Sequence, residues 1–172
     1  MVIAGFEIQS DSPVFLSILA IHVPMGLLAV VTGIAAMLKG KGRGAHTRFG
    51  SMYFWSLGVL FLTSTGLSAM RWSEDYHLFI LGAVAFSAAV IGRLARRRRW
   101  RTRIDLHIVG MGISYIVMLT AFYVDNGKNL PLWRDLPHVA YWLLPSVVGL
   151  PVIIWALGHD RRTIVYAGGT AR

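Results

Sequence analysis

The uncharged stretch from Pro13 to Leu38 limits the fold of this chain more than any other feature. It contains no Lys, Arg, Asp or Glu, and as a helix rising about 1.5 Å per residue it would measure roughly 39 Å. A bilayer's hydrocarbon core is about 30 Å thick, so this stretch can cross it with some tilt. Pro24 lies inside the stretch, and we expect it to kink the helix near Ile21.

Four further apolar stretches follow and occupy most of the 172 residues. With 55% hydrophobic and 15% charged residues, the composition is that of a membrane protein. We therefore predict an all-α integral membrane bundle of about five transmembrane helices, forming a single membrane domain over residues 1–172. The predicted spans are about 13–38, 51–70, 76–95, 104–124 and 138–157. The first span is too long for a signal-peptide core, so we expect no cleavage there.

The connectors between the predicted spans differ in character. Residues 39–50 form a glycine-rich basic connector and residues 71–75 a short turn. Residues 125–137 contain two prolines, and we interpret them as a structured turn at the membrane surface. Aromatic side chains near that turn are expected to anchor it at the interface, as is common in membrane proteins. They are Trp133, Tyr141 and Trp142.

The net charge of +9 is distributed unevenly between the two sides of the predicted bundle. Of the 17 cations, all but Arg71, Lys128 and Arg134 fall in the connectors after the first and third spans or in the carboxyl-terminal tail. The positive-inside rule then places the amino terminus outside and the carboxyl terminus in the cytoplasm. No nucleic-acid recognition motif accompanies the charge, so nucleic acid is not an expected partner. The lipid bilayer is, and anionic headgroups can attract the basic connectors.

Several classes of chemistry are disfavoured by what the chain lacks. There is no cysteine, which excludes disulfides, thiolate metal sites and a thiol nucleophile. No acidic residue lies deep in a predicted span, which weakens the case for an ion-coupled transporter. Three serines, Ser17, Ser87 and Ser114, lack a nucleophile-elbow context. We therefore predict no catalytic residue, and the sequence disfavours an enzyme.

The six histidines are the main candidates for chemistry, because imidazole can ligate haem or a metal ion or transfer protons. The predicted topology places His22, His77 and His138 toward the outside. It places His46, His107 and His159 toward the inside. The candidate cofactor ligands are His22, His46 and His107, followed by His77 and His138.

Two histidines within predicted spans have suggestive neighbours on their own helix faces. His22 shares a face with Met25, Gly26, Ala29 and Gly33, and His107 shares one with Gly110, Met111, Ser114 and Met118. Glycines beside a histidine leave room for a flat macrocycle, and a His/Met set suits copper or haem iron. The candidate metal ligands are therefore His22, Met25, His107 and Met111, and the candidate cofactor is haem b.

A simpler interpretation is that the small residues pack helices together while each histidine forms a hydrogen bond across an interface. Helical rise places His22 and His107 at different depths, so one haem would not easily join them. His22 would need His77 or His138 as its partner. His107 would need His46, and the connector carrying His46 would then have to dip inward.

Four segments together resemble a family of bacterial predicted membrane proteins, the domain of unknown function twenty-three-oh-six. They are IHVPMGLLAVVTGIAAML at 21–38, KGRGAHTRFGSMYFWSL at 41–57, LHIVGMGISYIVMLTAFYVDNG at 106–127 and YWLLPSVVGLPVI at 141–153. The resemblance covers about residues 14–157. It implies a multi-span protein of a bacterial cytoplasmic membrane with a histidine in its first span and a His-x-x-x-Gly element, here His46 to Gly50. It implies no established activity, and Thr47 stands where family members often have arginine.

Three classes of function remain open. The first is a binding or assembly module whose helices serve partners, either other membrane proteins or further copies of the chain. The second is a haem- or copper-binding transmembrane redox carrier. The third is a small-molecule transporter acting as an oligomer, for which Pro24 and the hydroxyl groups of Thr63, Ser64, Thr65 and Ser68 could line a polar path.

Overall fold

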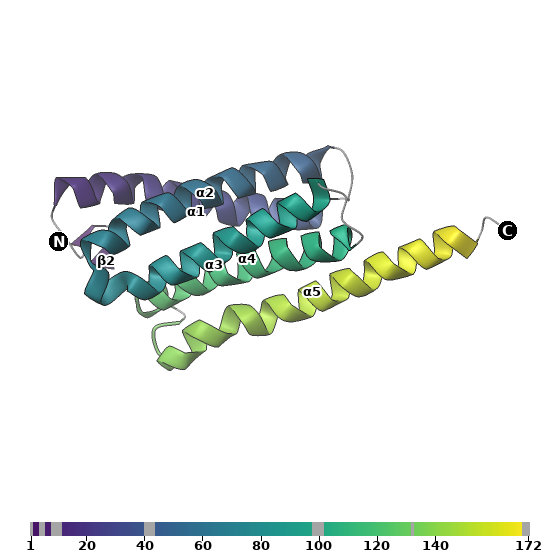
Figure 1. Cartoon of the computed structure of the whole chain (residues 1–172). Coiled ribbons are helices and arrows are strands. Elements are labelled where there is room, and N and C mark those ends of the chain that lie inside the picture. Colours follow the sequence, from purple (N-terminus) through teal and green to yellow (C-terminus); the bar gives the residue numbers. More distant parts are fainter. Residues whose placement is uncertain are drawn as a thin grey trace.

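Five long helices make up most of the computed structural model. It describes the backbone of residues 2–3, 6–7, 12–39, 44–97, 102–131 and 133–169, and the side chains of 12–39, 44–97, 102–131 and 133–159. The helices are α1 (Pro13–Leu38), α2 (Ala45–Met70), α3 (Trp72–Arg97), α4 (Arg103–Asn126) and α5 (His138–Gly169). They run up and down along one axis, as Figure 1 shows. A two-residue antiparallel pair, β1 (Val2–Ile3) and β2 (Phe6–Glu7), precedes them, and a 3₁₀ turn, η1 (Gly127–Asn129), follows α4.

All five helices contain a segment that is long and apolar enough to cross a membrane; in α5 that segment is His138–His159. The prediction of an all-α architecture with five candidate spans is thereby confirmed. Large apolar side chains point outward along the bundle, among them Leu27, Leu62 and Val147, which are 66%, 70% and 68% exposed. A surface of this kind suits contact with lipid, because water would make continuous apolar exposure unfavourable.

The helix ends differ from the predicted span ends. Helix α2 begins at Ala45 and not near 51, α3 begins at Trp72 and not near 76, and α5 continues beyond 157. The predicted connector at 39–50 is therefore wrong in its second half. Hydropathy marks the part of a helix inside hydrocarbon, whereas backbone hydrogen bonding continues into the polar interface. Gly44, with φ of 146°, precedes α2 in a backbone conformation that favours glycine.

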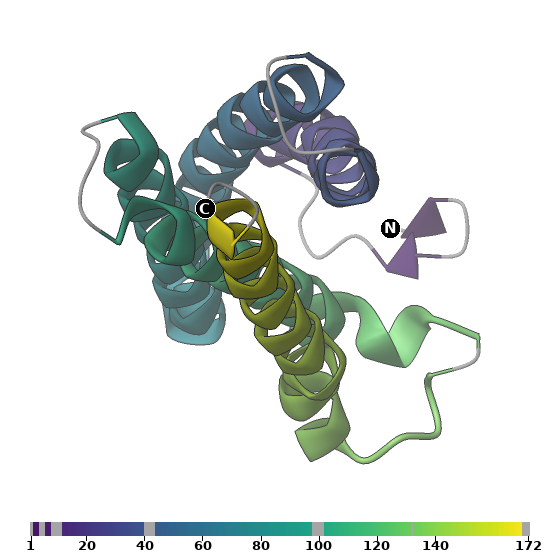
Figure 2. The same cartoon turned by 90° about the vertical axis from the view of Figure 1, so that its right-hand side faces the viewer.

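Helix α1 packs along α2 and α3 packs along α4, while α2 contacts α3 and α5 lies against α4. Figure 2 shows this arrangement end-on, with the carboxyl-terminal end of α5 toward the viewer. The core joins α1, α2, α3 and α4 through small and aromatic residues: Ala29, Tyr53, Phe54, Leu57, Ala85, Ala89, Tyr115 and Met118. Small residues let the helix backbones approach closely, as membrane helices commonly do.

The structure also bears on two further predictions, the kink at Pro24 and the polar path lined by hydroxyl groups. Helix α1 continues through Pro24 without a break. The hydroxyls of Thr63 and Thr65 donate hydrogen bonds to carbonyls of their own helix, at 2.9 Å from Val59 and 2.8 Å from Phe61. Such back-bonding satisfies a hydroxyl inside a membrane helix without a polar path beside it.

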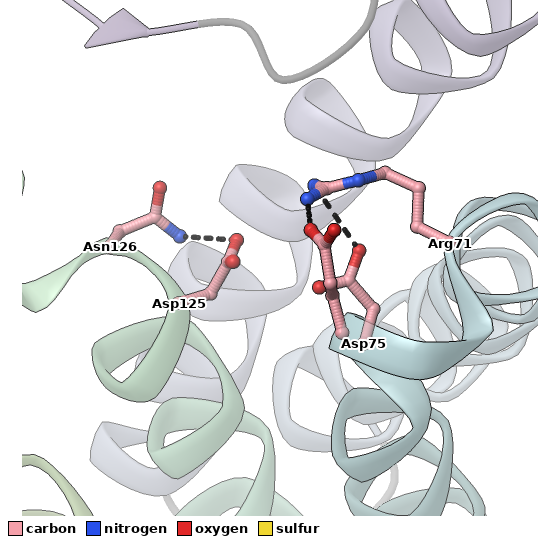
Figure 3. A network of polar contacts seen from close by, with 5 residues as sticks. Arg71, Asp75, Asp125 and Asn126 are labelled. Atoms are coloured by element: carbon pink, nitrogen blue, oxygen red, sulfur yellow. Dashed lines mark hydrogen bonds and ion pairs between the residues drawn. The ribbon is translucent and has the colours of Figure 1, made fainter.

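Charged and polar side chains gather where α2 meets α3 and where α4 ends (Figure 3). Arg71 forms ion pairs with Glu74 and, at 3.5 Å, with Asp75 in the first turn of α3. The amide of Asn126 donates to the carboxylate of Asp125 at 3.1 Å. Acidic groups in the first turn of α3 also interact favourably with its helix dipole. This end of the bundle is here called the Arg71 end, and its position outside the cell stays a prediction from the placement of cations.

Beyond α4, the turn predicted at 125–137 begins later, because Asp125 still belongs to the helix. Its described residues, 127–131 and 133–137, form η1 and further hydrogen-bonded turns, and residue 132 lies outside the described residues. The Tyr141 hydroxyl donates to the Trp133 carbonyl at 2.9 Å. The Trp133 ring packs against Tyr123, with centroids 5.5 Å apart.

Candidate functional site

A pocket of about 250 Å³ opens at the end of the bundle opposite Arg71. It lies where α1 and α3 end and where α2 and α4 begin, so four helix termini meet around it. We call it the inner-end pocket. Its lining residues are Gly33, Ala36, Met37, His46, Thr47, Gly50, Ser51, Tyr53, Phe54, Arg93, Arg96, Arg97, His107, Met111 and Tyr115.

His46 enters the pocket because α2 begins six residues earlier than the apolar stretch does. It occupies the first turn of α2, and its Nδ1 lies 2.8 Å from the carbonyl oxygen of Ala36 in the last turn of α1. The last carbonyls of a helix lack partners within that helix. The imidazole therefore caps α1 and is held in place by it.

His107 is positioned by the close contact of α3 and α4. Its Nδ1 lies 3.1 Å from the carbonyl oxygen of Gly92. A methyl group added at Gly110 would lie 2.8 Å from the Ala88 carbonyl oxygen and 2.8 Å from the Gly92 Cα. Glycine at both positions lets the two backbones touch. That contact brings the Gly92 carbonyl within reach of the histidine.

The rings of His46 and His107 are neighbours in the pocket lining, in an edge-type contact. Their centroids are 6.2 Å apart and their planes are inclined by 76°. A carbonyl oxygen can only accept a hydrogen bond, so Nδ1 of each neutral ring carries the proton and Nε2 is the basic nitrogen. The two histidines thus come from different helix pairs and share one tautomer, fixed in each case by a backbone carbonyl.

Three arginines of α3 supply the charge at the pocket. The Arg93 guanidinium lies over the Phe54 ring, with Cζ 4.5 Å from the ring centroid, which is a cation–π contact. Arg96 and Arg97 are exposed and follow at helical spacings of three and four residues. No Asp or Glu lines the pocket among the residues the structure describes. The pocket therefore favours an anionic group.

The floor of the pocket is formed by two tyrosines and a glycine. The Tyr53 hydroxyl lies 2.8 Å from Ser114 Oγ, and the Tyr115 hydroxyl donates to the Val30 carbonyl at 3.1 Å. A methyl group at Gly33 would lie 2.4 Å from a ring carbon of Tyr115. Glycine there lets the Tyr115 ring lie against α1, where both residues line the pocket.

The other predicted ligands lie elsewhere. The Nδ1 of His22 is 2.9 Å from the Thr63 hydroxyl oxygen. The Thr63 hydroxyl donates its proton to a carbonyl of α2, so the imidazole is the donor in the bond across the α1–α2 interface. This is the simpler role that the sequence allowed. In the described part of the chain no ring contact joins His22 to His77 or His138. His77 packs against Trp142, at 6.2 Å between centroids.

The remaining two histidines contact aromatic rings of their own helix, α5. His138 lies edge-on to Tyr141, at 6.0 Å, and His159 stacks on Trp155, at 5.5 Å. Met111 lines the inner-end pocket, and Met25 does not. Across the described residues no three His, Asp or Glu side chains come together in a way that could hold a bare metal ion.

Sequence reasoning found His46 and His107 but missed the arginines of the pocket. It treated Arg93, Arg96 and Arg97 mainly as topology signals, with attraction to anionic lipid headgroups as a second role. Their spacing of three and four residues was the available clue, because such residues share one helix face. Phe54 carried no comparable signal. No protein-family model, curated protein or solved structure matches the chain, so the site is interpreted from its own geometry.

Proposed function

We propose that this chain is a binding module of a bacterial cytoplasmic membrane and that its inner-end pocket holds an amphiphilic ligand with an anionic group. One observation carries the proposal. Arginine and histidine side chains share the pocket with apolar walls, and no acidic side chain of the described chain lines it. A ligand with an apolar body and a negatively charged end complements both parts.

The apolar part of the ligand would lie against Met37, Phe54 and Met111. Its charged part would meet Arg96 and Arg97 at the exposed mouth. Arg93, held over Phe54 at 4.5 Å, is preorganised and needs little ordering on binding. Arginine suits carboxylates and phosphates because its planar guanidinium can donate two parallel hydrogen bonds.

The proposed topology supports the same assignment. The described cations of the two basic connectors lie at the pocket end of the bundle, and the positive-inside rule puts that end in the cytoplasm; they are Lys39, Arg48, Arg96, Arg97 and Arg103. The amino terminus is then outside. The ligand would reach the pocket from the inner leaflet or from the cytoplasm.

Native mass spectrometry of the protein, released from mild neutral detergent, tests this proposal. We expect one stoichiometric small-molecule adduct on the wild-type chain and its loss in an Arg96→Gln/Arg97→Gln variant. Both arginines are exposed, so the variant should fold. Arg48→Gln is the matched control, since Arg48 is an exposed arginine near the pocket but outside its lining. A wild-type chain without an adduct, or an adduct equally abundant in all three proteins, would refute the proposal.

A further inference from the structure

We infer that the ligand of the inner-end pocket is a b-type haem whose iron is ligated axially by His46 and His107. The inference rests on the proposed function, since it names the ligand of the same pocket. It is carried by the separation of the two rings, by the carbonyls that orient them and by the number of ligands the pocket can offer.

The ring separation matches a bis-histidine site. Two imidazoles that ligate one iron through Nε2 on opposite faces have centroids about 6 Å apart, because each metal–nitrogen bond is about 2 Å and each centroid lies about 1.1 Å behind its nitrogen. The observed centroid separation is 6.2 Å. The spacing of the two ring centroids is therefore the one that a single iron between the rings requires.

The hydrogen bonds of both rings are also those expected of metal-ligating histidines. Metal-ligating histidines almost always donate their second ring N–H to a carboxylate, water or backbone carbonyl, which fixes the tautomer and the ring orientation. His46 donates through Nδ1 to Ala36 and His107 does so to Gly92, at 2.8 and 3.1 Å. Two histidines oriented in this way, from α2 and α4 in the lining of one pocket, form a pair of supported ligands.

The number of ligands separates haem from a bare ion. Zinc and copper sites built by protein alone need three or four ligands, and the described residues bring no third His, Asp or Glu to this pair. Met111 lines the pocket, but it lies one turn from His107 on the same helix, so these two side chains cannot occupy opposite faces of one metal. A macrocycle brings four equatorial nitrogens and needs only two axial ligands.

The rest of the pocket fits the periphery of haem. Met37, Phe54 and Met111 provide apolar contacts for the macrocycle. Arg96 and Arg97 at the mouth match the two propionate carboxylates. The volume of about 250 Å³ is below the range of about 300–1,000 Å³ typical of small-molecule sites, so one edge of the haem would remain exposed at the mouth.

Absorption and electron paramagnetic resonance spectra of the purified protein test this inference. The chain is expressed with iron and a haem precursor supplied, purified in mild detergent, and in a second preparation titrated with hemin. We expect about one haem per chain and the spectrum of a low-spin, six-coordinate b-type centre, both oxidised and after dithionite reduction. His46→Ala and His107→Ala should each convert the centre to high spin or lower the haem content at least tenfold. Added imidazole should restore the low-spin signal.

His22→Ala and His77→Ala are the matched controls, because they remove histidines outside the pocket and should retain the wild-type spectrum. A low-spin centre that persists in both His46→Ala and His107→Ala would overturn the axial assignment. Loss of the signal equally in His22→Ala would do the same.

The test separates failure of this inference from failure of the proposed function. A wild-type chain that binds no hemin but carries another stoichiometric adduct, lost in Arg96→Gln/Arg97→Gln, would overturn haem and leave the anionic-ligand pocket standing. A chain with neither haem nor any adduct would overturn both.

Discussion

Gly110 is the residue on which the position of His107 depends most directly. Its would-be methyl group meets backbone atoms of Ala88 and Gly92 at 2.8 Å, and backbone atoms cannot move aside as a flexible side chain does. We expect Gly110→Ala to push α3 and α4 apart and to lower the free energy of unfolding by about 1–3 kcal/mol, the usual cost of overpacking. Unfolding in mixed detergent micelles, followed by circular dichroism, measures this.

Gly50→Ala is the control for that prediction. Gly50 is also a helical glycine, but nothing lies within 4 Å of its would-be methyl group. Removing a glycine from a helix should leave stability unchanged or raise it by up to about 1 kcal/mol. Equal destabilisation by both substitutions would contradict the close α3–α4 contact.

The hydrogen bond between Tyr53 and Ser114 gives a second prediction at the residue scale. Their oxygens are 2.8 Å apart in the core, and hydrogen bonds between membrane helices contribute about 0.6 kcal/mol on average. We expect Tyr53→Phe to lower the free energy of unfolding by about this amount. A double-mutant cycle with Ser114→Ala should show a matching coupling energy. Tyr76→Phe, at a tyrosine that is 50% exposed, should have no effect, and strictly additive losses in the cycle would argue against the bond.

At the scale of the elements, the start of α2 decides whether His46 reaches the pocket. Gly44, with φ of 146°, adopts a conformation that is essentially restricted to glycine, and other residues would be strained there by about 1–3 kcal/mol. We expect Gly44→Ala to destabilise the protein by that amount, and Gly158→Ala in α5 to be neutral or mildly stabilising. The same micelle unfolding measures both, and a neutral Gly44→Ala would show that α2 begins differently.

The early start of α2 also shows which parts of the fold and the site could be predicted from the sequence and which could not. Hydropathy located all five helices, because each must carry about 20 apolar residues to cross a bilayer. It misplaced the start of α2, because Ala45 to Gly50 are helical but not especially apolar. The sequence could state that His107 would need His46, yet only the helical start at Ala45 brings the two rings to 6.2 Å. The role of Phe54 depends on which α3 residue packs over it, which no local pattern encodes.

At the scale of the whole molecule, the orientation in the membrane is the least local claim and follows from the placement of cations. The absence of cysteine makes it directly measurable. In intact cells a membrane-impermeant thiol reagent should label Ser73→Cys, which lies at the Arg71 end. It should label Thr102→Cys, at the pocket end, only after the membrane is opened. Both positions are exposed, and the reverse pattern would invert the proposed topology.

The claim that the inner-end pocket binds a ligand is tested most directly by filling the pocket without touching its histidines or arginines. Gly50 lines the pocket and has nothing within 4 Å of its would-be methyl group, so Gly50→Leu should fold and occupy the ligand's space. Gly158→Leu, at an equally open position of α5, is the control. Native mass spectrometry should find one adduct per chain on the wild type and on Gly158→Leu, and none on Gly50→Leu. An adduct of equal abundance on all three chains would contradict the account.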